Sequence, residues 1–356
     1  MKNFPRFLIV LAGLIFFLAY VSAPDKTRPF KGMKDRLPRA ASVVLRNLRR
    51  SRMSYSGNRR KKLLRKSDFR TSEFWKTADV QDIDDLKTMQ TDMNATSADG
   101  LTLLTMAVLH NRNPRVIKAL IAAGADIEKT NGNGVTACWM GVRNKAPETV
   151  TLIEAGADVN ASDNEGVTPL MIAAEEHFND GLMEFLIEHG ADVNAQTYND
   201  GRTPLLIAAG RGGQTSSVLI LLSAGADVSV RDNDGRTPLY AAAEKNPTPD
   251  LLNILIAAGI GVDVPDNDGK TPLMATVSHN TTPAVVQTLI KAGANVNARA
   301  KDGKTPLIFA ADKRRPDHDV ITALMENGAD PEIRDLSGRK AADYLDPDAR
   351  GLLDRR

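Results

Sequence analysis

A unit of nearly constant length recurs along most of this chain, and that period restricts the fold more than any other feature. In most copies a threonine before Pro-Leu marks the start and a glycine before Ala-Asp or Ala-Asn marks the end. The threonines, spaced 32 to 35 residues apart, are Thr102, Thr136, Thr168, Thr203, Thr237, Thr271 and Thr305. The glycines are Gly124, Gly156, Gly190, Gly225, Gly259, Gly293 and Gly328. Because both markers stay in phase over seven copies, the sequence predicts stacked repeats from about residue 70 onward.

Residues 200–228 show why each copy forms a helix pair. Gly201 follows an aspartate and suits a tight turn, because glycine tolerates positive φ. Thr203 can cap a helix with its hydroxyl, and Pro204 fits the first helical position, where no N–H is needed. A narrow apolar face follows on a first helix, formed by Leu205, Ala208 and Ala209.

The second half of the unit predicts another helix, which Gly225 ends as glycine commonly does. Its apolar residues are Val218, Leu219, Leu221 and Leu222. Such a pair of short helices cannot bury its apolar surface alone, so each copy must stack on its neighbours.

The motifs D-G-R-T-P-L-x-x-A-A and G-A-D-V-N-A resemble those of the ankyrin repeat family, over roughly residues 70–356. The resemblance implies an all-α repeat: an ankyrin-type solenoid of helix pairs with β-hairpin loops. The first two copies lack the proline and have Leu103 and Ala137 instead. The family usually has histidine after T-P-L, where this chain has Thr105, Trp139, Met171, Leu206, Tyr240, Met274 and Ile308. We therefore expect an apolar ladder in place of polar links between repeats.

The array needs closing units at both ends. Residues 71–98 are expected to form an N-terminal capping repeat before seven ankyrin-like repeats over 99–335, and residues 336–356 a C-terminal cap. The first helix of the N-terminal capping repeat should contain Phe74, Trp75, Ala78 and Val80, and its second helix should contain Ile83, Leu86 and Met89. Prolines in several inter-helix turns should start the second helix, at Pro114, Pro249 and Pro283.

Residues 1–23 are expected to be a signal anchor or a signal peptide. Lys2 and Arg6 precede seventeen residues without a charge, which as a helix would extend about 25 Å, near the lower limit for a membrane span. Its apolar membrane residues include Phe7, Leu11, Leu14 and Phe17. Val21, Ser22 and Ala23 resemble a cleavage site, but Pro24 should obstruct cleavage, so we favour an uncleaved anchor. A soluble chain with a buried first helix is the third alternative.

Residues 24–70 form a basic linker with 17 Lys and Arg residues against 3 Asp, a net charge of +14. A possible amphipathic helix includes Ala41, Val44, Leu45 and Leu48 and could lie on anionic lipid. The candidates for contact with the lipid surface are Arg46, Arg49, Arg50, Arg59, Arg60, Lys61 and Lys62. A solvated, disordered tether is the simpler alternative, and a nucleic-acid arm or nuclear address at residues 59–62 is less favoured.

The charge distribution also bears on localisation. The linker after the apolar segment carries more positive charge than the segment's N-terminal side, which has two positive charges. The positive-inside rule therefore places the array in the cytoplasm. A signal sequence would instead place it in the periplasm or outside the cell. The whole chain has a net charge of +2, so residues 71–356 carry −14.

The sequence offers little chemistry for catalysis, and no metal or cofactor is expected. The five histidines, His110, His177, His189, His279 and His318, lie in different repeats without zinc spacing. The one cysteine, Cys138, is expected to be a buried structural thiol. The D-N-D-G loops at Asp232 and Asp266 lack the alternating oxygens and closing glutamate of a calcium loop.

The remaining candidate is a protein-binding surface, which in ankyrin-like stacks is usually the concave side formed by loop tips and first-helix ends. The residue before each threonine is apolar in three copies and cationic in four: Leu101, Val135, Val167, Arg202, Arg236, Lys270 and Lys304. Helix-end candidates are Arg211, Lys245 and His279. They suggest an apolar patch beside a basic stripe that binds an acidic or mixed partner. Alternatively, Asp200, Asp234, Asp268 and Asp302 neutralise the cations.

These features favour a non-catalytic scaffold or adaptor, tethered to a membrane by its N-terminal helix and binding a protein partner on the concave face. The alternative is an exported ankyrin binding protein released after signal cleavage. An enzyme or a nucleic-acid-binding protein is less favoured, since no catalytic constellation was found.

Overall fold

The computed structural model describes residues 69–175, 180–211, 215–245, 248–279, 283–313 and 316–354. These residues all belong to one compact unit, Asp68–Arg356. The membrane and lipid-surface candidates, from Phe7 to Lys62, lie outside the described residues, as does His177.

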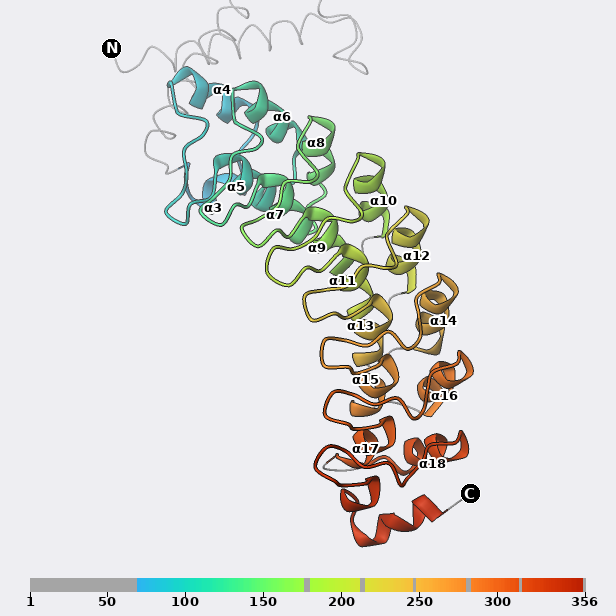
Figure 1. Cartoon of the computed structure of the whole chain (residues 1–356). Helices are drawn as coiled ribbons and strands as arrows, with labels where there is room; N and C mark the ends of the chain where they lie inside the picture. The colour runs from blue at the N-terminus through green and yellow to red at the C-terminus, as the bar shows by residue number, and fades with distance from the viewer. Residues whose placement is uncertain are drawn as a thin grey trace, which may run out of the picture. The chain divides into compact units, whose positions relative to one another are not determined.

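Helices of the described residues form two rows (Figure 1). The first row contains α3 (Ser72–Trp75), α5 (Leu103–His110), α7 (Ala137–Arg143), α9 (Pro169–Glu175), α11 (Pro204–Gly210), α13 (Pro238–Glu244), α15 (Pro272–Ser278) and α17 (Pro306–Ala311). The second row contains α4 (Val80–Thr88), α6 (Pro114–Ala122), α8 (Thr149–Glu154), α10 (Asp180–Glu188), α12 (Thr215–Ser223), α14 (Pro249–Ala257), α16 (Pro283–Lys291) and α18 (His318–Glu326). Each helix packs on a counterpart in at least one neighbouring repeat, so the predicted stack of helix pairs is confirmed.

The threonine markers start the first-row helices as predicted. The Thr203 hydroxyl accepts a hydrogen bond from the backbone N–H of Leu206 at 3.3 Å. The same cap occurs at Thr102, Thr136, Thr168, Thr237, Thr271 and Thr305. Prolines start α6, α14 and α16, which confirms that prediction for the second row.

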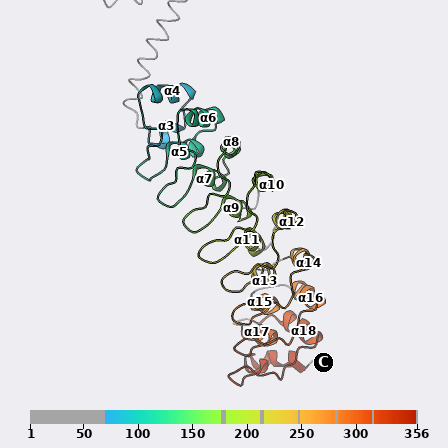
Figure 2. The same cartoon turned by 45° about the horizontal axis from the view of Figure 1, so that its top comes forward.

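The loops between repeats are tight turns that project beyond the first row, away from the second (Figure 2). Gly201 has the predicted positive φ of 68°, and a Cβ there would lie 2.7 Å from Oδ1 of Asn233 in the next loop. The loops are therefore packed too closely for a larger residue at this position. Among the described residues the hairpins form no named strand, and an isolated antiparallel bridge joins Thr96 to Thr102.

The core runs continuously between the two rows. Leu205, Ala208 and Ala209 of α11 are fully buried, as are Val218 and Leu221 of α12. In the same helix Leu219 is 46% exposed, so it covers the outside of the stack. Cys138 is buried as predicted, and that burial raises the pKa of its thiol to about 12.

The expected apolar ladder after T-P-L is wrong at two positions. The indole Nε1 of Trp139 donates to the backbone oxygen of Val167 in the next repeat at 2.8 Å. The hydroxyl of Tyr240 donates to Oδ2 of Asp266, also in the next repeat, at 2.7 Å. Aromatic residues with a polar atom can thus supply the link that an aliphatic residue cannot. Met171, Leu206, Met274 and Ile308 are buried apolar residues, as expected.

A second series of links joins the turns that follow the second-row helices. Asn160 accepts from the N–H of Asp192 at 2.7 Å, and Asn194 accepts from the N–H of Asp227 at 2.8 Å. Ser229 occupies the next equivalent position, but its shorter side chain donates to Asp227 in its own turn. Among the hydrogen bonds of the described residues, none joins Ser229 to the following repeat.

Replacing Ser229 with asparagine is expected to restore this link by accepting from the N–H of Gly261. One additional hydrogen bond should raise the free energy of unfolding by about 0.5–1.5 kcal/mol. Chemical denaturation would measure the change, with Asn194→Ser as the reciprocal variant that should lose a similar amount. An unchanged midpoint for Ser229→Asn, together with a loss for Asn194→Ser, would show that Gly261 is out of reach.

The two ends differ in part from expectation. Ala78 lies between α3 and α4 rather than in the first helix, and Val80 starts the second helix. The reason is that Asp79 caps α4 through a reciprocal pair of bonds with Asp82, so the chain must leave α3 before it. At the other end, the described residues form two short 3₁₀ helices, η2 (Ala341–Asp343) and η3 (Pro347–Asp354). The domain boundaries given above stay a prediction.

Candidate partner-binding face

The loop tips and the C-terminal ends of the first-row helices form one surface, here called the loop face. Its central part, across α9, α11 and α13, contains a hollow with a volume of about 450 Å³. Five predicted partner-binding residues line this hollow: Val167, Arg202, Arg211, Arg236 and Lys245. The fold therefore brings together residues that lie up to two repeats apart in the sequence.

The apolar half of the predicted surface is mostly not exposed. Val135 is only 6% exposed and belongs to the core, which corrects its assignment as a contact residue. Leu101 and Val167 are partly buried against that core. These side chains are buried because the residue before each capping threonine lies where the loop meets the first helix.

The cations of the loop face have acidic neighbours. Arg202 lies 3.0 Å from Asp200, and Lys270 lies 3.4 Å from Asp268. Lys304 pairs with Asp312 at 2.6 Å rather than with Asp302. Exposed pairs of this kind contribute little to stability, but they largely neutralise the expected basic stripe. Lys270, Lys304 and His279 do not line the hollow.

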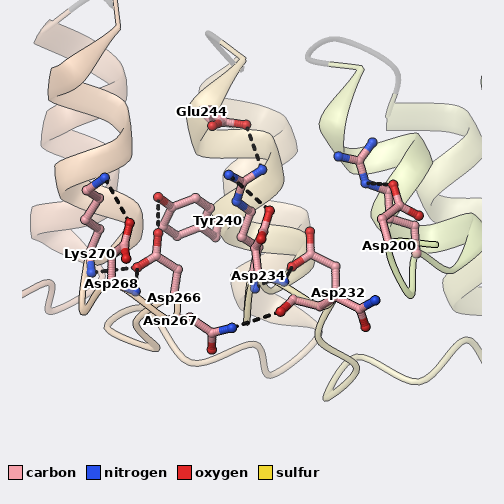
Figure 3. Close-up of polar contacts among 12 residues, drawn as sticks. Asp200, Asp232, Asp234, Tyr240, Glu244, Asp266, Asn267, Asp268 and Lys270 are labelled. Atoms are coloured by element: carbon pink, nitrogen blue, oxygen red, sulfur yellow. Dashed lines mark hydrogen bonds and ion pairs between the residues drawn. The ribbon is translucent and has the colours of Figure 1, made fainter.

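Inside the hollow, two arginines are paired with acids from different places. Arg211 follows α11 and forms an ion pair with Glu175 of α9, in the preceding repeat. Arg236 lies 3.4 Å from Asp234 and 3.8 Å from Glu244, with its guanidinium 5.8 Å from the centre of the Tyr240 ring. Figure 3 shows Asp234, Tyr240 and Glu244 close together where the loop meets α13.

A buried aspartate organises each of two successive loops. Oδ1 of Asp232 accepts from the N–H groups of Asp234 and Arg236, at 3.0 and 2.8 Å. Oδ1 of Asp266 accepts from two backbone N–H groups in the same way. These bonds confirm the interpretation of the D-N-D-G loops as turns, because the carboxylates satisfy their own backbone. Burial raises the pKa of Asp232.

Replacing Tyr240 with phenylalanine is expected to lower the free energy of unfolding by about 1–3 kcal/mol, because Oδ2 of the buried Asp266 loses its hydroxyl donor. Tyr198→Phe is a matched control: Tyr198 is 69% exposed, and among the described residues its hydroxyl is hydrogen-bonded only to Ser162. Thermal or urea unfolding would compare the two. Equal losses for both variants would contradict a specific role for the Tyr240 hydroxyl.

The described ranges contain no group of three or more His, Cys, Asp or Glu side chains placed to hold a metal ion. In the same ranges, no helix has both the length and the apolar character required to cross a membrane.

Stacked helix pairs joined by projecting loops define a helical repeat solenoid, a class that binds other molecules through its surface. The chain belongs to the ankyrin repeat family: a family model for ankyrin repeats (three copies) matches residues 104–197, 140–232, 170–266 and 239–335. No curated protein matches the chain. Ankyrin repeats are protein–protein interaction modules, and the family is generally non-catalytic.

Proposed function

We propose that this protein is a non-catalytic adaptor that holds another protein on its loop face, tethered to a membrane by residues 1–23. The observation that supports the first part is the hollow across α9, α11 and α13. It combines a partly apolar floor, including Leu206 and Ile207, with charged walls from three repeats. A concave site with a few placed charged groups suits recognition of a protein side chain.

Two arginines of the hollow have acidic residues beside them. Arg211 forms an ion pair with Glu175 and Arg202 with Asp200. Both pairs are partly exposed, so exchanging the acid for a charged group of a partner costs little free energy.

Charge reversal on the rim tests this part of the proposal. Arg202 and Lys245 are 46% and 59% exposed, so replacing both with glutamate should leave the fold intact and weaken partner binding at least tenfold. The control is a double reversal on second-row helices, at Lys118 and Lys291. A partner bound equally well by both double variants would rule out the loop face.

The membrane tether is proposed from the sequence, namely the uncharged residues 7–23 followed by the basic residues 24–70. Reporters fused after Arg356, one active only when exported and one fluorescent only in the cytoplasm, would give the side of the membrane. Fluorescence in the membrane fraction with an intact N-terminus is the expected result. Loss of residues 1–23 from the mature mass would instead favour the exported binding protein.

A further inference from the structure

One arginine of the hollow has side-chain donors that its own fold does not use. Arg236 lines the hollow, and its Nε is buried without a hydrogen-bond partner among the described residues. Its terminal nitrogens lie 3.4 Å from Asp234 and 3.8 Å from Glu244, and neither contact is a hydrogen bond. A buried donor without an acceptor is costly, so the guanidinium would gain from an oxygen placed in the hollow.

Comparable cations in this part of the array use their donors within the fold. In the next two repeats, Lys270 and Lys304 stand at the position of Arg236, and each donates a hydrogen bond to an aspartate. In the same loop as Arg236, Arg231 donates from Nε and Nη2 to backbone oxygens of its own loop and of the next. Arg236 thus differs from its neighbours in having its fork of donors unoccupied.

The surroundings of Arg236 leave this fork accessible from the hollow. The guanidinium lies 5.8 Å from the centre of the Tyr240 ring, which is buried and held by its hydrogen bond to Asp266. The Arg236 side chain is still 26% exposed, and it lines the hollow. A guanidinium can donate two parallel hydrogen bonds to the two oxygens of one carboxylate, at about 2.7–2.9 Å.

The other charges of the hollow favour one carboxylate over a run of acidic residues. Arg202 and Lys245 lie within ion-pair distance of acids, but among the described residues neither side chain donates a hydrogen bond. They therefore add donors and positive charge beside Arg236. The acids that line the hollow would repel a strongly acidic segment, so selection depends on the unused donors rather than on net charge. These acids are Glu165, Glu175, Asp200, Asp232 and Glu244.

We propose that the hollow receives a single glutamate side chain of the partner protein, whose two carboxylate oxygens accept from the guanidinium of Arg236. This proposal rests on the function proposed above and specifies the chemistry of the partner. The floor formed by Leu206 and Ile207 would contact the methylene groups of the glutamate. The proposal agrees with the loss of binding expected for the rim reversals, because both of them place negative charge beside the incoming carboxylate.

The test uses the full chain in an uncharged detergent, with isoleucine methyl groups labelled for NMR spectroscopy. The probes are two capped peptides of glycine and serine, identical except for one central glutamate or glutamine. The glutamate peptide is expected to shift the Ile207 methyl signal saturably. The glutamine peptide should bind at least fivefold more weakly, because an amide has one acceptor oxygen and no charge. Ile254, on α14 of the second row, is the internal control and should not shift.

Variants at one position separate the charge of Arg236 from its fork of donors. Arg236→Gln should weaken binding of the glutamate peptide about tenfold or more. Arg236→Lys keeps the charge but not the planar fork, so it should bind at least threefold more weakly than the wild type. Lys270→Gln, at the equivalent position of the next repeat and outside the hollow, is the matched control and should change binding less than twofold. An unchanged Ile254 signal in each variant would show that the stack is intact.

Three results would each overturn the proposal: no shift of Ile207 with the glutamate peptide, equal binding of the two peptides, or equal effects of Arg236→Gln and Lys270→Gln. The rim reversals described above are measured with the partner protein itself. They test the adaptor function separately, so a failure here would leave that result interpretable.

Discussion

Replacing Leu205 with alanine is expected to lower the free energy of unfolding by about 2–5 kcal/mol, the largest effect predicted here for a single substitution. Leu205 is 0% exposed and lies in the first turn of α11, in contact with the continuous core. The variant loses the buried methyl groups of Leu205 and leaves a cavity between two neighbouring repeats. Both repeats depend on the packing of this side chain. Urea denaturation followed by circular dichroism would measure the loss.

Leu219→Ala provides the control because it removes the same atoms from the next helix. Leu219 is 46% exposed, so its replacement should cost well under half of the Leu205 value. Similar losses at the two positions would mean that burial in the stack does not determine stability.

The second large effect is expected for Asn111→Ala at the N-terminal end of the array. Asn111 is 5% exposed, and its Nδ2 donates to the backbone oxygens of Trp75 and Ala78 at 2.8 and 2.7 Å. The substitution leaves two carbonyl groups of the capping repeat without this donor, at a cost of about 2–3 kcal/mol. Hydrogen exchange should show faster exchange in α3 and α4, while α13 to α17 stay protected.

Asn144→Ala is the matched control, since Asn144 is exposed and its Nδ2 donates only within its own helix end, to Met140. It should leave exchange in α3 and α4 unchanged. Uniform acceleration along the whole array in Asn111→Ala would contradict a local role for this side chain.

The repeat period predicts the parts of the fold that depend on neighbouring residues in the sequence. Thr203 caps its helix and Pro204 starts it because both interactions lie within one turn. The same reasoning predicted the positive φ of Gly201. These features need no knowledge of the adjacent repeat.

Links between repeats were not predictable in the same way. Trp139 and Tyr240 occupy equivalent positions in the motif, yet one donates to a backbone oxygen and the other to a carboxylate. The choice depends on side-chain length and on what the next loop presents. Tyr240 is visible in the sequence as a departure from the motif, but its hydrogen bond to Asp266 appears only once the loops are stacked.

For the candidate surface, too, the sequence predicts the positions of residues but not their contacts with other repeats. The residue before each capping threonine could be placed near the loop face, and Arg202, Arg236 and Val167 do line the hollow. Their charges could not be evaluated from the sequence, because Arg211 finds its acid in another repeat and Lys304 prefers Asp312. The prediction that Val135 lies on the surface is wrong, because its burial depends on how the neighbouring residues pack against it.

The most direct test of the account is to locate the partner on the array. A photo-crosslinking amino acid at Ile207, on the floor of the hollow, and another at Leu219, on the exposed side of α12, would be compared in cells. We expect one protein to crosslink to position 207 and not to position 219, and Arg202→Glu with Lys245→Glu to remove the product. The same protein crosslinking from position 219 alone would contradict binding at the loop face.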